Sequence, residues 1–460
     1  LRVADFYKKR ADKIRADAES AAIPEEDKKR LLRVALSFEA WAIQCRNKNR
    51  LDAMRALAQM DERFTVSSAL LDVDPYLFGV NNGVVDLRTG LLRSNAKAEF
   101  VLKRSIVDYQ EDAVSSLWLR FVSEITSYPG DIVDGKVSLI RRPALLEALH
   151  RLLGYCLTGH TDAHKLFMFL GIGSNGKNAL LDTVMRIVAD YGISMPPEII
   201  LASKFDKQAE QASPMARMLQ GIRLAVCAES KDGQQLDTGI VKRISGGGYL
   251  TARGLHEMPV TFLMTHKLIL MTNHQPGLAQ MDPAVRGRLF VVPFDMRWNR
   301  PGETDPDPTL PDADPKLMQK LWAEREGILQ WLIEGAVKYH THGLLVSPEV
   351  AAFTKDYVES QDVLSRWLGS LERCAPPDGL LASDLVFDYE EYCRSEDEPS
   401  AQMTAADMGR KLKQRGITGK RTSSGRRYGL RPKQDLAHDV DDEAPTKEPL
   451  DIDALAEVFR

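Results

Sequence analysis

The stretch KLFMFLGIGSNGKNALLDTVMRIV (Lys165–Val188) decides the fold of this chain. It opens with an apolar run typical of a buried strand, continues with a glycine-rich loop, and ends with apolar residues at helical spacing. Strand, loop and helix in this order are the setting in which the pattern G-x-x-x-x-G-K binds phosphate. Gly171, Gly176 and Lys177 fit the pattern. We therefore predict an α/β protein with a P-loop core.

The physics of such a loop names its ligand. Glycines let backbone N–H groups approach phosphate oxygens, the helix N-terminus adds positive potential, and the lysine bridges the β- and γ-phosphates. At position 178 the motif normally has Ser or Thr as a Mg²⁺ ligand, whereas this chain has Asn178, whose amide oxygen can also bind Mg²⁺. We expect ATP and Mg²⁺ as cofactors, with ATP binding better supported than fast hydrolysis. The predicted ATP-binding residues are Gly171, Gly173, Ser174, Asn175, Gly176, Lys177 and Asn178.

Three more apolar runs follow, and each adjoins a polar residue that suits ATP chemistry. RLAVCAES ends near Glu229, HKLILMTN ends at Asn273, and RLFVVPF begins at Arg288. Short apolar runs of this kind predict buried parallel strands. In ATPases a strand-end carboxylate organises Mg²⁺ or orients the attacking water, and an arginine from a neighbouring subunit stabilises the transferred charge. We expect Glu229 to serve as this carboxylate, Asn273 to sense the γ-phosphate, and Arg288 or the nearby Arg286 to act in trans.

The flanking segments predict further parts of the protein. Residues 21–60 show helical periodicity with a basic face, residues 76–92 carry two turn signals and predict a small β-meander, and residues 113–160 again read as helical. Asn299–Pro315 has five prolines and predicts an extended surface connection, followed by an amphipathic helix over Leu321–His340.

Charge is separated along the C-terminal part. Arg410–Lys433 contains ten basic residues and no acid, whereas Gln434–Arg460 contains nine acids and two bases. The basic run indicates a polyanion-binding module, with a solvated surface as the simpler alternative. A strand, a turn at Ser424–Gly425 and a second strand would place Arg426, Arg427 and Tyr428 on a wing.

Composition limits the classes of protein. The 460 residues are 44% hydrophobic and 27% charged, with a formal net charge of -4, which excludes disordered and collagen-like chains and a globally basic surface. Five scattered cysteines without CxxC spacing are typical of a reduced cytosolic protein, and no apolar run has the length of a membrane span. We expect a cytoplasmic protein. Because the chain begins at Leu1, we also expect it to be part of a longer protein, in which a primase domain could come first.

The order of motifs resembles that of superfamily 3 helicases. GYCLTG, GIGSNGKN, ARMLQGIRLAVCAES, KRISGGGYLTAR, LILMTNHQP and AVRGRLFVVPF follow one another as they do in the poxvirus-type and phage or plasmid primase–helicase branch. The resemblance extends over residues 76–430. It implies an AAA+-like ATPase core, with Lys177 as the Walker A lysine, Glu229 as the Walker B acid, Asn273 as sensor 1 and Arg288 as the arginine of the closing motif.

The resemblance also implies DNA contacts and a division of the chain. Between Walker B and sensor 1 the family has a pore β-hairpin that holds DNA, and Lys242, Arg253 and His256 fall in this segment; an Asp usually follows the paired glycines, where this chain has Gly248. We expect an N-terminal helical and small β region at 1–112, a helical region at 113–160, the ATPase core at 161–300, a Pro-rich connection and helical lid at 301–345, a winged-helix-like basic module at 346–433 and an acidic tail at 434–460.

The function implied is that of an ATP-dependent replicative DNA helicase of a phage, plasmid or other mobile element. Such an enzyme works as a ring, expected to be a hexamer, on single-stranded or forked DNA. Two alternatives stay open from the residues alone. Asn178 and Gly248 favour a nucleotide-gated DNA-binding or initiator protein with weak hydrolysis, and the loop by itself would suit a P-loop enzyme with an unrelated substrate, such as a defence ATPase. DNA-stimulated ATP turnover distinguishes the helicase from the initiator, and binding of single-stranded DNA distinguishes both from an unrelated P-loop enzyme.

Overall fold

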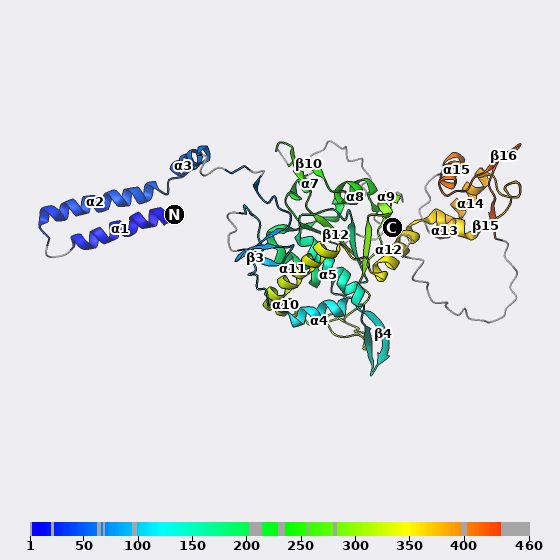
Figure 1. Cartoon of the computed structure of the whole chain (residues 1–460), viewed down its shortest axis with the longest axis horizontal. Helices are drawn as coiled ribbons and strands as arrows, with labels where there is room; N and C mark the ends of the chain where they lie inside the picture. Colours follow the sequence, from blue (N-terminus) through cyan, green and yellow to red (C-terminus); the bar gives the residue numbers. More distant parts are fainter. Residues whose placement is uncertain are drawn as a thin grey trace.

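A parallel β-sheet lies at the centre of the chain (Figure 1). The structure, a computed structural model, describes residues 2–19, 23–61, 66–67, 70–93, 99–201, 214–228, 235–254, 257–278, 283–396 and 403–433. Within these residues the sheet has five strands in the order β14-β6-β12-β8-β7, and every neighbouring pair is parallel. The strands are β6 (Leu166–Leu170), β7 (Gly192–Met195), β8 (Leu224–Cys227), β12 (Lys267–Thr272) and β14 (Leu289–Pro293). The predicted α/β class with buried parallel strands is confirmed; β7 was not predicted.

Both faces of the sheet are covered, which explains why its strands read as continuous apolar runs. In β6, Phe167 and Phe169 belong to one buried cluster, and Leu166 and Met168 belong to another on the opposite face. The first cluster includes helices α4 (Ser116–Ile125), α5 (Pro143–Leu157), α6 (Lys177–Val188), α10 (Leu317–Ala323) and α11 (Arg325–His342). The second includes α7 (Pro214–Met218), α8 (Thr238–Ser245) and α12 (Pro348–Gln361).

Helices α5 and α11 touch through glycine. A Cβ atom added to Gly154 would lie 2.0 Å from the carbonyl carbon of Gly335, so neither backbone leaves room for a side chain at this contact. Beside it the rings of His150 and Trp331 stack with centroids 4.0 Å apart. The single helix predicted over residues 321–340 is divided in two, because α10 ends at Ala323 before α11 begins. Half of α11, nine of its 18 residues, is buried against the domain.

The N-terminal region is helical, as predicted. It consists of α1 (Arg2–Ala18), α2 (Glu25–Gln44) and α3 (Lys48–Met60), which Figure 1 shows beside the central domain. Helices α1 and α2 pack along each other. The buried residues of these two helices are alanines spaced seven apart, Ala4, Ala11 and Ala18 in α1 and Ala35 and Ala42 in α2. Small side chains at this spacing let two helices approach closely.

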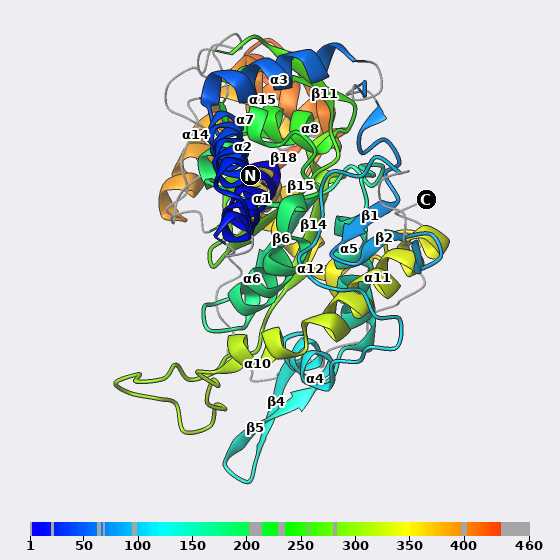
Figure 2. The same cartoon turned by 90° about the vertical axis from the view of Figure 1, so that its left-hand side faces the viewer.

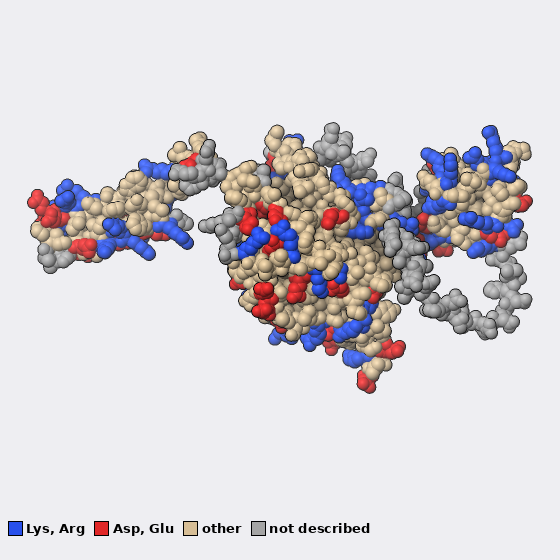
Figure 3. Space-filling view, viewed as in Figure 1, with Lys and Arg blue, Asp and Glu red and all other residues tan. Residues whose placement is uncertain are grey.

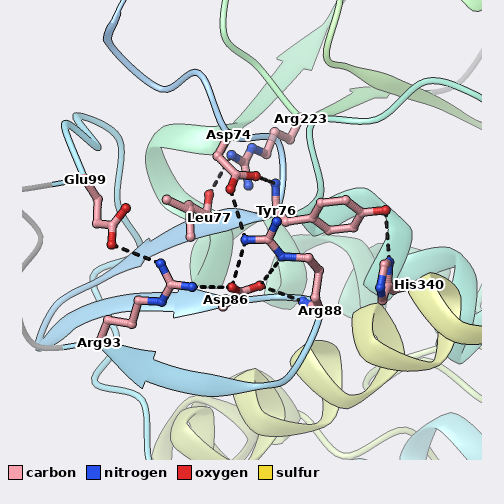
Figure 4. Close-up of polar contacts among 9 residues, drawn as sticks. All are labelled: Asp74, Tyr76, Leu77, Asp86, Arg88, Arg93, Glu99, Arg223 and His340. Atoms are coloured by element: carbon pink, nitrogen blue, oxygen red, sulfur yellow. Dashed lines mark hydrogen bonds and ion pairs between the residues drawn. The ribbon is translucent and has the colours of Figure 1, made fainter.

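The predicted β-meander is present as β1 (Leu77–Val80), β2 (Gly83–Asp86) and β3 (Leu91–Arg93), joined antiparallel. It is tied to the central sheet by Arg223, which immediately precedes β8. The buried guanidinium of Arg223 donates a hydrogen bond to the carbonyl of Leu77 at 2.7 Å (Figure 4). It donates a second hydrogen bond to the carbonyl of Leu157 at 2.6 Å.

Residues 113–160 are not helical throughout. Between α4 and α5 the chain forms an antiparallel hairpin of β4 (Tyr128–Val133) and β5 (Lys136–Ile140), which projects from the domain in Figure 2. Its turn has Asp134 at φ 50° and Gly135 at φ 76°, a left-handed conformation that Asp and Gly adopt readily. The helical prediction rests on apolar residues that lie in α4 and α5, namely Leu117, Phe121, Ile125, Leu145, Leu149 and Leu153. The hairpin between these helices exposes Ile132, Val133 and Ile140.

Residues after α12 form a separate module with its own core. Its elements are α13 (Val363–Ser370), β15 (Leu371–Arg373), α14 (Ala382–Ser395), α15 (Ala405–Gln414), β16 (Lys420–Thr422), β17 (Gly425–Arg427) and β18 (Leu430–Pro432). Strand β15 pairs with β18, and β16 pairs with β17. Trp367, Met408 and Tyr428 are buried together. The acidic run 434–460 lies outside the described residues.

Short elements complete the central domain. These are β9 (Gln235–Leu236), β10 (Tyr249–Ala252), β11 (Val260–Leu263), β13 (Gly277–Leu278), α9 (Pro283–Arg286) and the 3-10 turns Ala189–Tyr191 and Pro197–Ile199. A third 3-10 turn, Pro376–Asp378, lies in the C-terminal module between β15 and α14. In the described part of the chain no helix combines the length and the apolar character that crossing a membrane requires.

A buried carboxylate organises the β-meander. Asp86 is 4% exposed and accepts hydrogen bonds from Arg88 Nε at 2.8 Å and from Arg93 Nη2 at 2.6 Å (Figure 4). The hydrogen bonds from Arg88 are the main cause that lowers the pKa of Asp86. Arg88 also pairs with Asp74, and Arg93 with Glu99.

Replacing this anion should destabilise the protein in a pH-dependent way. We expect Asp86→Asn to lower the free energy of unfolding at pH 7 by about 2–3 kcal/mol, because two arginines lose their shared partner. The folded-state pKa of Asp86 lies below its unfolded value, so its contribution is complete above about pH 4 and is lost as the pH falls through the folded pKa. Urea unfolding should therefore show a gap between wild type and variant that narrows below about pH 4. Asp131→Asn, at an exposed position in β4, is the control; a gap that stays constant into acid would contradict this role for Asp86.

Candidate functional site

The glycine-rich loop lies at the edge of the sheet where the parallel strands end. Gly171 follows β6, Asn273 follows β12, and Phe294 follows β14. Open parallel sheets bind ligands in the crevice outside the carboxyl ends of their strands. A cleft of about 520 Å³ opens here, lined by Pro129, Leu170, Gly171, Ile172, Asn273, Gln275, Phe294, Asp295, Met296, Arg297, Asp307, Leu310 and Phe353.

The loop needs glycine at two of its positions. A Cβ atom on Gly171 would lie 2.2 Å from the carbonyl oxygen of Phe294, so the loop starts in direct contact with the end of β14. Gly176 has φ 83°, and a Cβ atom there would lie 2.5 Å from Ile125 of α4. Between them, the buried side chain of Asn175 donates long hydrogen bonds of 3.4 Å to the carbonyls of Ile172 and Phe294. The loop is thus held between β14 and α4.

Lys177 and Asn273, which the sequence predicted as partners at one site, lie together. Lys177 is the first residue of α6 and is 3% exposed. Its ammonium group donates hydrogen bonds to the Gly171 carbonyl at 2.5 Å, to Asn273 Oδ1 at 3.1 Å and to the Thr272 carbonyl at 3.3 Å. The cation is therefore fixed across the ends of β6 and β12. Asn178, the next residue, has an exposed side chain.

Two predicted site residues, Glu229 and His256, lie outside the described residues. The preceding strand β8 pairs with β12, so that Cys227 of β8 lies opposite Leu270. Strand β8 is buried throughout and ends at Cys227, and the described segment ends one residue later at Ala228.

Arg288 is far from the cleft of its own chain. It precedes β14, and β14 runs parallel to β6, with Leu289 opposite Leu166 and Pro293 opposite Leu170. Arg288 and Gly171 are therefore separated by the whole length of the five-residue strand, six residue steps or about 20 Å. The Arg288 guanidinium donates a hydrogen bond to the Ala284 carbonyl at 2.7 Å.

The segment predicted to hold DNA contains an antiparallel hairpin of β10 and β11. Its side chains alternate, so that Leu250 and Ala252 are buried while Tyr249 and Thr251 are exposed. Arg253 follows β10, is exposed, and donates a hydrogen bond from Nε to the Glu257 carbonyl at 3.0 Å.

Lys242 comes from a different element than the hairpin, the last turn of α8. The turn between α8 and β10 contains Gly247 and Gly248 at φ 71° and 83°. A Cβ atom on Gly248 would meet open space, so glycine is favoured at this position by the positive φ of the backbone and not by a close contact.

The C-terminal basic run is divided between paired and unpaired side chains. Arg415 pairs with Asp362 at 2.8 Å, and Arg410 and Arg431 pair with Asp407 and Glu372. Six exposed bases contact no acid among the described residues: Lys411, Lys413, Lys420, Arg421, Arg426 and Lys433, the last of which donates a hydrogen bond to the Gly369 carbonyl. Figure 3 shows Lys and Arg side chains projecting from this module.

The predicted wing is only partly exposed. Arg426 is exposed and lies opposite Arg421, whereas Arg427 donates a hydrogen bond to the Gly379 carbonyl at 2.8 Å. Placing Tyr428 on the wing is wrong: it is 2% exposed, because it fills the core of the module. The turn lies at residues 423–424, one residue earlier than predicted.

The sequence did not reveal the segment after β14 as part of the site. Arg297, Asp307 and Leu310 line the cleft, and hydrogen bonds from Thr309 lower the pKa of Asp307, which keeps this carboxylate charged. The backbone N–H of Trp298 bonds to the Ser174 carbonyl at 3.0 Å, and Arg300 Nε bonds to the Ser174 hydroxyl at 2.5 Å. The segment 299–315 is largely exposed, as a surface connection should be, but it is not fully extended, because Asn299 closes a turn and Arg300 contacts the loop. Its one sequence signal was its position directly after a strand of the sheet.

Comparison with known proteins finds relatives of parts of this chain. Residues 4–127 match the family described as "D5 N terminal like". The chain is 27% identical over 309 residues to "Putative helicase L207/L206" of Acanthamoeba polyphaga mimivirus, covering 65% of this chain and 31% of that protein. It is 23% identical over 386 residues to "Putative helicase 022R" of Frog virus 3, covering 70% of this chain and 39% of that protein. "Putative primase C962R" of African swine fever virus is 23% identical over 316 residues, covering 65% of this chain and 31% of that protein.

The chain thus spans about a third of the length of these curated relatives. Among solved structures, the apo C-terminal region of NrS-1 (305–718) covers 71% of this chain and 78% of that chain at 10% identity, with a TM-score of 0.42. The predicted resemblance to the primase–helicase family is confirmed by the match of residues 4–127 and by the similarity to these viral helicases and primases.

Proposed function

We propose that this chain is the ATP-driven DNA helicase part of a replication protein from a virus, phage, plasmid or other mobile element. The observation that carries the proposal is the contact of the Lys177 ammonium group with Asn273 at the carboxyl edge of the parallel sheet. A lysine after a glycine-rich loop, held beside a polar residue of the adjacent strand, suits a triphosphate-binding P-loop of the AAA+ type. The relatives named as helicases and primases support a role in replication.

The residues at the cleft would divide the work on ATP. The loop amides of 173–178 and Lys177 would bind the phosphates, and Asn273 would sense the γ-phosphate through Lys177. The exposed Asn178 side chain at the start of α6 suits an oxygen ligand of Mg²⁺, which Glu229 would share, partly through water. When bound, Mg²⁺ neutralises charge on the phosphates.

Arg288 would act on the ATP of a neighbouring copy. Because it lies at the opposite end of β14 from the loop, it cannot serve the cleft of its own chain. A ring of identical subunits, expected to be a hexamer, would bring the amino edge of one sheet to the carboxyl edge of the next. This arrangement agrees with an arginine finger supplied in trans.

DNA would meet two basic surfaces. Lys242 and Arg253, with His256 beside them in sequence, would follow the backbone of single-stranded or forked DNA at the β10–β11 hairpin. The second surface is the C-terminal module, whose helices and β16–β17 hairpin suit a winged helix. A nucleotide-gated initiator with weak hydrolysis is the second candidate, since Asn178 offers Mg²⁺ an amide in place of the usual hydroxyl.

Removing the loop lysine tests the proposal directly. We expect wild-type ATP turnover to rise with single-stranded DNA, and Lys177→Ala to lower turnover by about 10²–10³, because a preorganised charge on the phosphates is lost. Steady-state ATPase assays with and without DNA measure both effects. Lys355→Ala, an exposed lysine of α12, is the control. Normal turnover in Lys177→Ala would refute the ATP site, and turnover indifferent to DNA would favour the initiator.

The trans role of Arg288 has its own test. Arg288→Ala should retain ATP binding and lose about 10³–10⁵ in turnover, because an arginine finger acts on transition-state charge. Mixing Arg288→Ala with Lys177→Ala should restore part of the activity, since some interfaces then combine an intact loop with an intact Arg288. No recovery in proven mixed assemblies would argue against a shared site.

The C-terminal surface can be tested through salt dependence. We expect the double variant Arg421→Ala/Arg426→Ala to weaken DNA binding and to flatten the slope of log affinity against log salt by roughly 0.7–0.9 for each lost phosphate contact. Arg410→Ala should change the slope less, because Asp407 already pairs with this arginine. Fluorescence anisotropy across a salt series provides the slopes; equal slopes in wild type and double variant would leave the hairpin as a solvated face.

A further inference from the structure

Arg300 lies on the glycine-rich loop of its own chain. Its Nε donates a hydrogen bond to the Ser174 hydroxyl at 2.5 Å. Its Nη2 is 3.1 Å from the point where a Cβ atom on Gly173 would stand. Ser174 itself has φ 58°, and its carbonyl accepts the Trp298 N–H at 3.0 Å. The guanidinium therefore reaches the part of the loop that, in a phosphate-binding loop, faces the ligand.

The backbone that carries Arg300 is fixed by its neighbour Asn299. This side chain is 4% exposed and donates hydrogen bonds to the carbonyls of Asp307 at 2.9 Å and Leu310 at 3.3 Å. Its own oxygen accepts the Asp307 N–H at 3.1 Å, and its backbone bonds to Pro311 and Ala313 at 2.9 Å each. A buried amide with every polar group satisfied makes a rigid turn. The hydrogen-bonded turn around Asn299 thus positions Arg300 against the glycine-rich loop.

Arg297 and Arg300, the two arginines of this turn, differ in whether an acid pairs with the guanidinium. Arg297 forms an ion pair with Glu303 at 2.9 Å. From Arg300, Glu303 accepts a hydrogen bond from the backbone N–H alone, at 2.8 Å. Within the described parts of the chain, the guanidinium of Arg300 has the neutral Ser174 hydroxyl as its hydrogen-bond partner and no carboxylate. The positive charge is therefore available to an anion.

We propose that Arg300 is a phosphate-binding residue of the ATP site in its own chain, and that the Ser174 hydroxyl occupies its guanidinium until nucleotide arrives. This inference rests on the proposed ATP site and adds a second cation to Lys177. A guanidinium presents two parallel N–H donors that match two oxygens of a phosphate. Arg300 would bind in cis, in contrast to Arg288, and would contribute to affinity for nucleotide as well as to turnover.

The test measures equilibrium binding of ATP to the full chain by calorimetry, at about 50 mM and about 500 mM salt, so that screening reports on charge. The variants are Arg300→Ala, Arg300→Lys and Lys177→Ala. The matched control is Arg55→Ala, which removes the same charge from the exposed surface of α3. We expect Arg300→Ala to weaken ATP binding about 10-fold or more at low salt and by less at high salt, because a contact with a charged oxygen is lost. Arg300→Lys should restore part of the affinity, since lysine keeps the positive charge but lacks the two parallel N–H donors of the guanidinium.

The outcomes separate the inference from the function on which it rests. If Lys177→Ala loses ATP binding while Arg300→Ala equals Arg55→Ala, the ATP site stands and the role of Arg300 is refuted. If Arg300→Ala loses affinity equally at both salt concentrations and lysine restores nothing, Arg300 only supports the loop, and the inference is again overturned. A wild-type chain that binds no ATP would refute both.

Discussion

The position of strand β6 is the constraint on which the site depends. It is hydrogen-bonded to β12 on one side and to β14 on the other, and its side chains are buried on both faces. A strand paired on both edges and buried on both faces cannot slip by one residue, because every apolar side chain would then move to the opposite face of the sheet. The loop that follows it therefore starts from a fixed point, and Lys177 reaches back to the ends of β6 and β12 from the first turn of α6.

The same constraint explains why the chain after β14 belongs to the site. Gly171 lies so close to Phe294 that a single added carbon would clash with its carbonyl oxygen. The end of β14 and the start of the loop are thus in contact, and residues leaving β14 must pass over the loop. Asn299 then turns the chain back, so that Arg300 meets Ser174 and Arg297 and Asp307 line the cleft. The residues after β14 therefore form a wall of the cleft because β14 lies next to β6 in the sheet, and no additional helix or strand is required.

How much the sequence could predict follows from the range of the forces involved. Buried parallel strands and a glycine-rich loop leave local signals, so β6, β8, β12 and β14 and the pairing of Lys177 with Asn273 were accessible. Strand β7 has only four residues and is partly exposed, so GISM left little signal. The β4–β5 hairpin was missed because the helical periodicity of α4 and α5 on either side was extended across it, and the hairpin itself shows no alternation of burial. Tyr428 and Arg300 were missed for another reason: burial in a small core and contact with a loop 126 residues away are tertiary facts that no local pattern records.

Strand β14 carries an arginine near each of its ends, and this has a consequence for assembly. Arg288 precedes it at the amino edge of the sheet, whereas Arg300 follows it and returns to the loop at the carboxyl edge. If Arg300 grips the phosphates of its own chain and Arg288 those of the next, one rigid strand links two neighbouring sites. Any movement of β14 relative to β6 is resisted by five residues of parallel pairing, so a change in one site would be passed on by rotation of the whole sheet. Coupling between subunits would then come from rigid-body motion of the central domain, with the loops following.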